Sequence, residues 1–168
     1  MPRALVSLGS NISPEHNLPA AVALLLEAGS IRDVSRAYQS AAAGPPGQPD
    51  FVNAAVLFET DLAPEALRER LRRIEAELGR VRVEDKFAPR SIDLDLVLYD
   101  DVVMDTAGLS LPDPDLLLRP YLAVTIAEVD PAGLHPVTGE PLAEIAARLG
   151  GAVHLTHRPD IDLSLRAS

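Results

Sequence analysis

Two aspartates alternate with aliphatic residues between Ile92 and Tyr99, and this alternation constrains the fold more than any other feature of the chain. In a β-strand, residues i and i+2 point to the same face, so Asp93 and Asp95 share a face with their Cα atoms roughly 6.5–7 Å apart. The intervening residues face the opposite layer: Ile92, Leu94 and Leu96. Because two like charges at that distance destabilise each other, the pattern predicts a bound divalent cation. Carboxylate oxygens favour Mg²⁺, which usually binds together with phosphates.

Basic residues are concentrated just before this strand. Arg80, Arg82, Lys86 and Arg90 lie within eleven positions, and Lys86 is the only lysine of the chain. The formal net charge is −10, so the cluster contrasts with an acidic background. Cations that converge on a carboxylate-bound metal predict a polyphosphate substrate. An Asp-x-Asp pattern alone also fits a solvated strand face, so the prediction depends on the two features together.

Length and composition exclude several classes of protein. We expect residues 1–168 to form one domain, since this length suits one hydrophobic core. The chain has no cysteine, which excludes disulfide bonds and thiolate metal sites. It shows no signal peptide and no apolar run near the roughly 18 residues that span a bilayer, so we expect a cytoplasmic protein without membrane contact. The acidic balance argues against general nucleic-acid binding, although not against a nucleotide.

The hydrophobic pattern predicts an α+β fold of ferredoxin-like type, with a mainly antiparallel sheet and helices packed on one face. We expect strands at 4–8, 31–40, 51–60 and 92–99, with a short return strand at 102–104. We expect helices at 18–28, from Asp61 or Thr60 to Gly79, at 119–128 and at 142–149. In the second helix, four residues at helical spacing are core positions: Leu67, Leu71, Ile74 and Leu78.

Four ordered motifs resemble those of the 6-hydroxymethyl-7,8-dihydropterin pyrophosphokinase family. The stretch Phe87–Tyr99 is similar to the family's Pro-Arg and Asp-x-Asp signature at nearly every position. The other three matching stretches are Leu5–Asn11, Gln48–Ala55 and Ile74–Arg82. The resemblance covers roughly residues 4–149 and leaves residues 150–168 as a C-terminal extension of unknown role.

The resemblance implies an unusual phosphate transfer. In this family the β,γ-pyrophosphoryl group of ATP passes intact to the hydroxymethyl oxygen of the dihydropterin, leaving AMP, in folate biosynthesis. Asp93 and Asp95 are then the expected ligands of two Mg²⁺ ions, with ATP as co-substrate. The expected partners are small molecules alone, with no nucleic acid, membrane or obligate protein partner.

The resemblance also implies roles for individual residues. The expected catalytic residues are Arg80, Arg82 and Arg90. The expected ATP-binding residues are Glu75, Lys86, Phe87, Leu96, Ser110 and Arg119. The expected pterin-binding residues are Ser40, Ala41, Ala43, Phe51, Asn53 and Tyr121. Core packing is the alternative role for Phe51 and Tyr121, and a surface helix position is the alternative for Glu75.

The chain departs from the family pattern on the nucleotide side. Ala88 stands where a glycine is usual, Gly108 where a basic residue is frequent, and Asp113 where a histidine is usual. An aspartate repels phosphate, so we expect Asp113 to turn away from the polyphosphate. These departures leave two alternatives open. One is a homologue that binds pterin or nucleotide with weakened catalysis, and the other is a phospho- or nucleotidyltransferase with a different acceptor.

Overall fold

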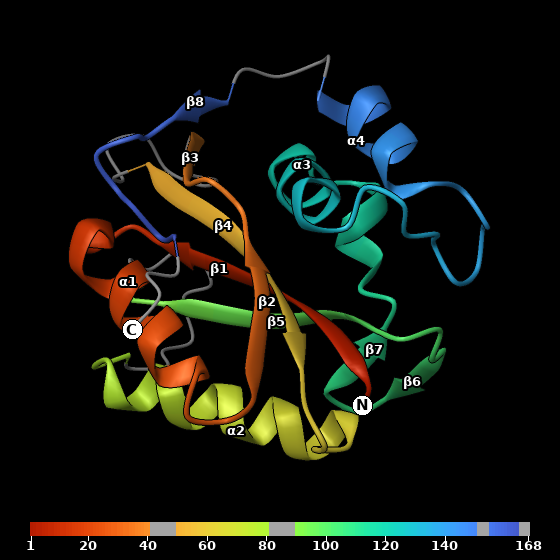
Figure 1. The fold of residues 1–168 in the computed structure, drawn as a ribbon, viewed down its shortest axis with the longest axis horizontal. Helices are drawn as coiled ribbons and strands as arrows, with labels where there is room; N and C mark the ends of the chain where they lie inside the picture. The colour runs from red at the N-terminus through yellow and green to blue at the C-terminus, as the bar shows by residue number, and fades with distance from the viewer. Residues whose placement is uncertain (41–49, 81–89, 151–154, 165–168) are drawn as a thin grey trace.

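The computed structural model describes residues 1–40, 50–80, 90–150 and 155–164. Its main sheet has six strands, in the order β5-β1-β4-β3-β8 with β2 also paired to β4 (Figure 1). All of these pairs are antiparallel. The strands are β1 (Arg3–Ser10), β2 (Ser30–Val34), β3 (Tyr38–Ser40), β4 (Phe51–Glu59), β5 (Asp93–Tyr99) and β8 (Thr156–His157). The predicted mainly antiparallel α+β fold is therefore confirmed.

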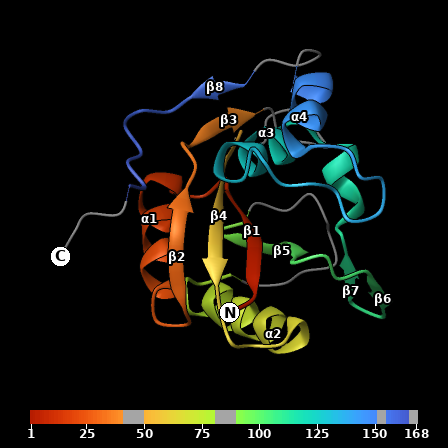
Figure 2. The same ribbon diagram turned by 45° about the vertical axis from the view of Figure 1, so that its right-hand side comes forward.

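The helices cover both faces of the sheet, whereas we expected them on one. Helices α1 (Pro14–Leu25) and α2 (Pro64–Glu77) pack on one face, and α3 (Pro120–Val129) and α4 (Leu142–Gly150) pack on the other. Figure 2 shows α2 below the strands and α3 and α4 above them. The reason is that the central strands are apolar on both faces. In β4, Val56 and Phe58 face α1 and α2, while Ala55 and Leu57 face α3 and α4.

Several predicted boundaries shift. The expected strand 31–40 is divided into β2 and β3, because Ser35 bonds to Ala55 through both its backbone N–H and its hydroxyl oxygen. Helix α1 begins earlier than expected, at Pro14. Proline suits this position because the N–H groups of the first turn have no acceptor within the helix, so the missing N–H of proline costs no hydrogen bond. Helix α2 has Ala63 at its N-cap and no side-chain cap, so neither predicted capping residue serves. Its core positions Leu67, Leu71 and Ile74 are buried as predicted, and Leu78 is partly buried.

A small hairpin lies beside the outer strand β5. It consists of β6 (Met104–Thr106) and β7 (Leu109–Leu111), and a 3-10 helix, η1 (Pro114–Leu117), follows it. The expected return strand at 102–104 therefore begins at Met104, later than predicted. Among the described residues, none of the helices combines the length and the apolar character needed to cross a membrane.

The C-terminal extension returns to the sheet. Strand β8 pairs with β3, and His157 lies opposite Tyr38 in the register (Figure 1). Arg158 donates to the Gln39 side chain at 2.9 Å. Beyond it, Ile161 and Leu163 are each 5% exposed and join the core between the sheet and α1. The extension therefore covers the β3 edge and contributes to the core.

Candidate active site

Strand register places Asp93 of the Asp-x-Asp motif and the predicted pterin residue Asn53 in one row of paired residues that runs across the sheet. Asp93 pairs with Gly9, Gly9 pairs with Asn53, and Asn53 pairs with Tyr38. Residues directly opposite each other in an antiparallel pair share a face. That face is the one covered by α3, because the Tyr38 hydroxyl donates to Glu128 of α3 at 2.7 Å. Neighbouring strands lie about 4.8 Å apart, so the Cα atoms of Asp93 and Asn53 are roughly 10 Å apart.

Gly9 lies between these two positions. A Cβ atom there would be 3.1 Å from Asn53 Oδ1 and 3.7 Å from Phe51 Cδ1. The first distance is tighter than an ordinary van der Waals contact. A residue without a side chain therefore leaves the Asn53 amide and the Phe51 ring in place, next to the carboxylates.

The predicted pterin residues gather around Asn53. This side chain is 4% exposed, and its Nδ2 donates to Ser40 Oγ at 2.9 Å. Phe51 lies opposite Ser40 in the register and is partly exposed. Tyr121 lies in the first turn of α3, and burial, followed by the charge of Asp115, raises the pKa of its phenol. The structure thus brings Ser40, Phe51 and Asn53 together, while Ala41 and Ala43 lie outside the described residues.

A buried ion-pair cluster joins the end of α2 to the start of β5. Arg80 Nη1 donates to Glu75 Oε2 at 2.8 Å and to Asp93 Oδ1 at 2.7 Å. Glu75 Oε2 also accepts from the Leu94 backbone N–H at 2.9 Å. The side chains of Glu75 and Arg80 are only 2% and 8% exposed. We expected Glu75 to contact ATP, and the structure places its side chain in the interior, against Arg80 and the Leu94 backbone N–H.

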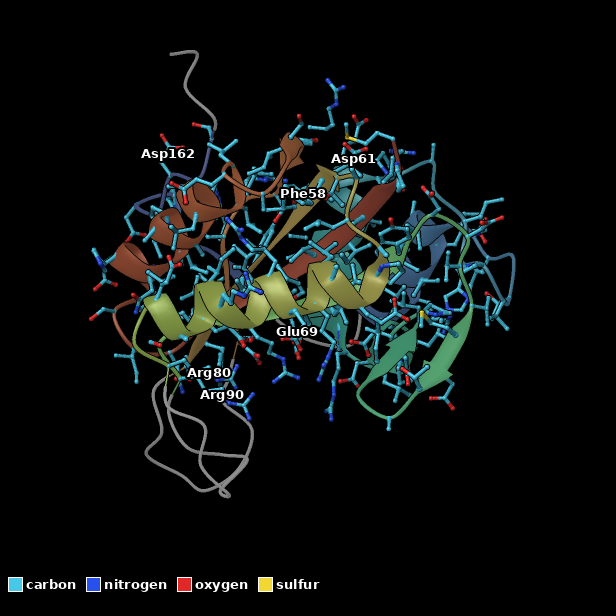
Figure 3. All side chains as sticks on the ribbon, turned by 90° about the horizontal axis from the view of Figure 1, so that it is seen from below. Phe58, Asp61, Glu69, Arg80, Arg90 and Asp162 are labelled. Carbon is cyan, nitrogen blue, oxygen red and sulfur yellow. The ribbon has the colours of Figure 1, made fainter. Side chains whose placement is uncertain are left out.

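Arg90 approaches Asp93 from the other side. Its Nη1 donates to Asp93 Oδ2 at 2.9 Å, and its backbone N–H donates to Asn11 Oδ1 at 2.7 Å. Figure 3 shows Arg80 and Arg90 near each other at the C-terminal end of α2. Both carboxylate oxygens of Asp93 are therefore paired with arginine. The arginine side chain of Arg90 is 27% exposed and is more accessible than that of Arg80.

Asp95 lies in a crowd of negative charges. Loss of hydration, followed by the charges of Asp93, Asp113 and Glu75, raises the pKa of its carboxyl to about 7. The Asp95 side chain is nevertheless exposed to solvent, so the neighbouring negative charges contribute more to its raised pKa than burial does. A divalent cation would relieve that crowding.

The available carboxylates suit Mg²⁺ better than they suit a metal ion whose ligands all come from the protein. Within the described ranges, no group of three or more His, Cys, Asp or Glu side chains is arranged to hold a metal ion. Mg²⁺ is usually bound through one or two carboxylates, with water and substrate phosphates completing its shell. Asp93 and Asp95 supply that number of carboxylates on one strand face.

A cleft of about 150 Å³ opens beside Asp95, between α2 and the β6–β7 hairpin. Two predicted ATP-binding residues, Leu96 and Ser110, line it. Arg68 and Arg72 of α2 line its other wall, and the sequence analysis did not include them. Their i, i+4 spacing in an acidic chain was the available signal, but it is also typical of a solvated helix face.

Asp113 also lines this cleft. Its Oδ1 accepts from the Asp115 backbone N–H at 2.9 Å and so caps η1. Burial raises the pKa of its carboxyl. We expected Asp113 to turn away from the polyphosphate. One of its oxygens is engaged in the cap, yet the residue faces the cleft and its charge acts on Asp95.

Of the remaining residues predicted to bind the nucleotide, the structure describes only Arg119. Arg119 is exposed at the N-cap of α3, where its charge acts on Tyr121. Arg82, Lys86 and Phe87 lie outside the described residues.

Comparison with known proteins gives consistent matches over most of the chain. The sequence profile of 7,8-dihydro-6-hydroxymethylpterin-pyrophosphokinase matches residues 5–131. A 2-amino-4-hydroxy-6-hydroxymethyldihydropteridine pyrophosphokinase of Synechocystis sp. is 40% identical over 145 residues, covering 84% of this chain and 73% of that protein. The protein of the same name from Aquifex aeolicus is 33% identical over 145 residues, covering 86% of this chain and 90% of its own length.

A solved structure has the same fold at low identity. The wild-type HPPK-DHPS of Plasmodium falciparum superimposes with a TM-score of 0.68 at 13% identity, covering 88% of this chain. This chain spans only 44% of that longer protein. At this identity the likeness concerns the fold alone.

Proposed function

This chain belongs to the 7,8-dihydro-6-hydroxymethylpterin-pyrophosphokinase family, and we propose that the cluster around Asp93 and Asp95 is where it transfers pyrophosphate. It is a pyrophosphokinase of folate biosynthesis. The proposed reaction moves the β,γ-pyrophosphoryl group of ATP to the hydroxymethyl oxygen of the dihydropterin and releases AMP. The observation that carries the proposal is the row in which Asp93, paired with two arginines, lies two strands from the buried Asn53 amide.

Asn53 and its neighbours form the proposed pterin side of the site. An amide presents both a donor and an acceptor to the edge of the heterocycle. The hydrogen bond from Asn53 Nδ2 to Ser40 Oγ fixes the orientation of the amide. Phe51 and Tyr121 are the proposed stacking partners for the two faces of the pterin ring. Ala41 and Ala43 stay as predicted lining residues.

The arginines provide the positive charge that the transferred group requires. Arg90 is the proposed direct phosphate ligand, because it is the more exposed of the two arginines on Asp93. Arg80 is held between Glu75 and Asp93, so its proposed contribution is a fixed charge that costs no reorganisation during the transfer. Arg82 and Lys86 stay as predicted phosphate contacts.

Asp93 and Asp95 are the proposed magnesium ligands. The cation would neutralise the phosphates and lower the pKa of the acceptor hydroxyl when it is bound. We predict that two Mg²⁺ ions bind here. The exposure of Asp95 to solvent supports this role, because it leaves the carboxyl group accessible to a cation. Its raised pKa reflects loss of hydration and the charges of Asp93, Asp113 and Glu75, and a bound cation would offset those charges.

The cleft beside Asp95 is the proposed position of the rest of the nucleotide. Leu96 and Ser110 line that cleft and keep their predicted roles in ATP binding. Phe87 and Arg119 stay as predicted contacts. We reassign Glu75 from nucleotide contact to positioning, since it is buried against Arg80 and Leu94.

The extension at 150–168 is proposed to belong to the same domain as the rest of the chain. Its support is the packing of Ile161 and Leu163 in the core that α1 and the sheet share. A cytoplasmic location and the absence of an obligate protein partner remain predictions.

One assay tests the proposed function. The protein is incubated with ATP, Mg²⁺ and 6-hydroxymethyl-7,8-dihydropterin, and AMP is measured by chromatography. We expect AMP that depends on the pterin, and we expect the Asp95→Asn variant to lose it while its far-UV circular dichroism is unchanged. The proposal fails if the wild-type protein releases AMP only with another acceptor, or binds both substrates without producing AMP.

A further inference from the structure

A chain of hydrogen bonds links the C-terminal extension to the residue that precedes β4. Arg158 Nη1 donates to Gln39 Oε1 at 2.9 Å, and Gln39 Nε2 donates to Asp50 Oδ2 at 3.0 Å. The Gln39 amide is therefore held at its oxygen by a cation and at its nitrogen by an acid. None of these three residues has a role in the site described so far.

The guanidinium of Arg158 is itself fixed by the extension. Its Nε and Nη2 donate to the two carboxylate oxygens of Asp160 at 2.9 and 2.8 Å, and Nη1 is directed at Gln39. A two-point pair of this kind fixes the plane of the guanidinium. Farther along the chain, Ile161 and Leu163 are buried in the core shared with α1. The segment that carries Arg158 is therefore anchored on its C-terminal side.

Strand β3 is the element that this anchor holds. It has only three residues and lies between β4 and β8. The Arg158 backbone N–H donates to Ala37 O at 2.8 Å, so the extension binds the backbone that leads into β3 as well as the side chain of Gln39. Successive side chains of a strand point to opposite faces. Tyr38 is held by Glu128 on the α3 face, and Gln39 is held on the other face.

The position of β3 sets the orientation of the Asn53 amide. Ser40, the last residue of β3, accepts a hydrogen bond from Asn53 Nδ2 at 2.9 Å. On the other side of the amide, Asn53 Oδ1 would lie 3.1 Å from a Cβ atom at Gly9, so this oxygen faces β1. The two ends of an amide differ, because the nitrogen donates and the oxygen accepts. The Ser40 hydroxyl therefore determines which end of the Asn53 amide faces β1.

We infer that Arg158 is a positioning residue for pterin binding. Through Gln39 it holds β3, and β3 in turn fixes the Asn53 amide through Ser40. This inference rests on the proposed function, since it takes Asn53 to be the residue that binds the pterin edge. Because Gln39 and Ser40 point to opposite faces of β3, Arg158 acts through the strand and not by contact with the pterin. The proposed metal site on β5 is separated from β3 by β1 and β4, so Arg158 affects the acceptor and not the nucleotide.

The test removes the charged head of Arg158 and keeps its aliphatic stem. The variants are Arg158→Met, Arg158→Lys, Gln39→Ala, and the double variant that combines Arg158→Met with Gln39→Ala. The matched control is Arg32→Met, which breaks an ion pair with Glu59 at the other end of β4. The kcat and the KM for each substrate are measured with the other substrate saturating. The side-chain amide signal of Asn53, identified by its loss in Asn53→Ala, is followed by NMR without substrates.

We expect Arg158→Met to raise the KM for the pterin about three- to tenfold, the size of one lost hydrogen bond, with kcat and the KM for ATP unchanged. Arg158→Lys should recover part of this loss, and the double variant should be no worse than Gln39→Ala. The Asn53 amide signal should shift in Arg158→Met, and Arg32→Met should change neither the signal nor the KM values.

Three results would overturn the inference: an Asn53 signal that does not move in Arg158→Met, an equal rise in both KM values, or an effect that adds fully to that of Gln39→Ala. A wild-type enzyme that forms no AMP, with an Asn53 signal that still depends on Arg158, would refute the proposed function and retain the positioning of Asn53 by Arg158.

Discussion

Replacing Glu75 by glutamine distinguishes a positioning role from a nucleotide contact. Glu75 Oε2 accepts from Arg80 at 2.8 Å and from the Leu94 backbone N–H at 2.9 Å, and the side chain is 2% exposed. Glutamine keeps the shape and one acceptor oxygen but removes the charge. The buried guanidinium of Arg80 then keeps one carboxylate as a hydrogen-bond partner, Asp93 at 2.7 Å, together with the Ile92 carbonyl oxygen at 3.4 Å.

The expected cost follows from these contacts. Breaking a buried ion pair by removing one partner costs about 3–5 kcal/mol when the other charge is left uncompensated. Here Asp93 still compensates Arg80, so we expect the smaller cost of a weakened charge-assisted hydrogen bond, about 1.5–3 kcal/mol. For a chain of this size, each kcal/mol lowers Tm by about 2–4 °C.

The assay combines unfolding with kinetics. We expect Glu75→Gln to lower the free energy of unfolding by about 1.5–3 kcal/mol in a urea titration. We also expect a lower kcat for AMP formation, because Arg80 and the Asp93 end of β5 lose their alignment. The matched control is Glu77→Gln, an exposed acid at the end of the same helix, which should change stability by less than about 0.5 kcal/mol.

A different result would refute the reasoning. If Glu75→Gln unfolds like the control but raises the KM for ATP, then Glu75 contacts the nucleotide, as the family resemblance implied. A loss of stability with unchanged kinetics would instead show that the cluster supports the fold without aligning the active site.

Four further predictions concern other parts of the molecule. Gly9→Ala should raise the KM for the pterin roughly tenfold and leave the KM for ATP unchanged, because the new Cβ would lie 3.1 Å from Asn53 Oδ1; equal changes for both substrates would contradict this. The raised pKa of Asp95, about 7, means that protons compete with the cation below that pH. The affinity for Mg²⁺ should therefore be about tenfold lower at pH 6 than at pH 8 in a calorimetric titration, since about a tenth of the carboxyl is ionised at pH 6. Because the raised pKa means that the folded, metal-free protein holds this proton more tightly than the unfolded chain does, its stability should decrease as pH rises through 7. An increase in Tm over that pH range would contradict this prediction. Ile161→Ala should cost about 2–4 kcal/mol in a urea titration, because Ile161 is buried in the core, and a cost below about 0.5 kcal/mol would show that the extension is not part of it.

Local patterns in the sequence determined most of the elements and one part of the site. The helical spacing of Leu67, Leu71 and Ile74 predicted the buried face of α2. The alternation from Ile92 to Leu96 predicted which side chains of β5 are buried and that Asp93 and Asp95 share a face. Such patterns can be recognised in the sequence because they involve residues only a few positions apart along the chain. The period of each helix or strand then fixes the face to which each side chain points.

Tertiary structure decided which distant residues meet. The register of β1 against β4 and β5 set Gly9 between Asn53 and Asp93, and no local pattern contains that distance. The burial of Glu75 and the position of Arg68 opposite Gly108 depend on how α2 packs against β5 and the β6–β7 hairpin. A charged residue on a helix reads the same in sequence whether it faces water, a strand or a cleft. Its surroundings arise from packing between elements far apart in the chain, and packing is therefore what decides which of these environments each residue has.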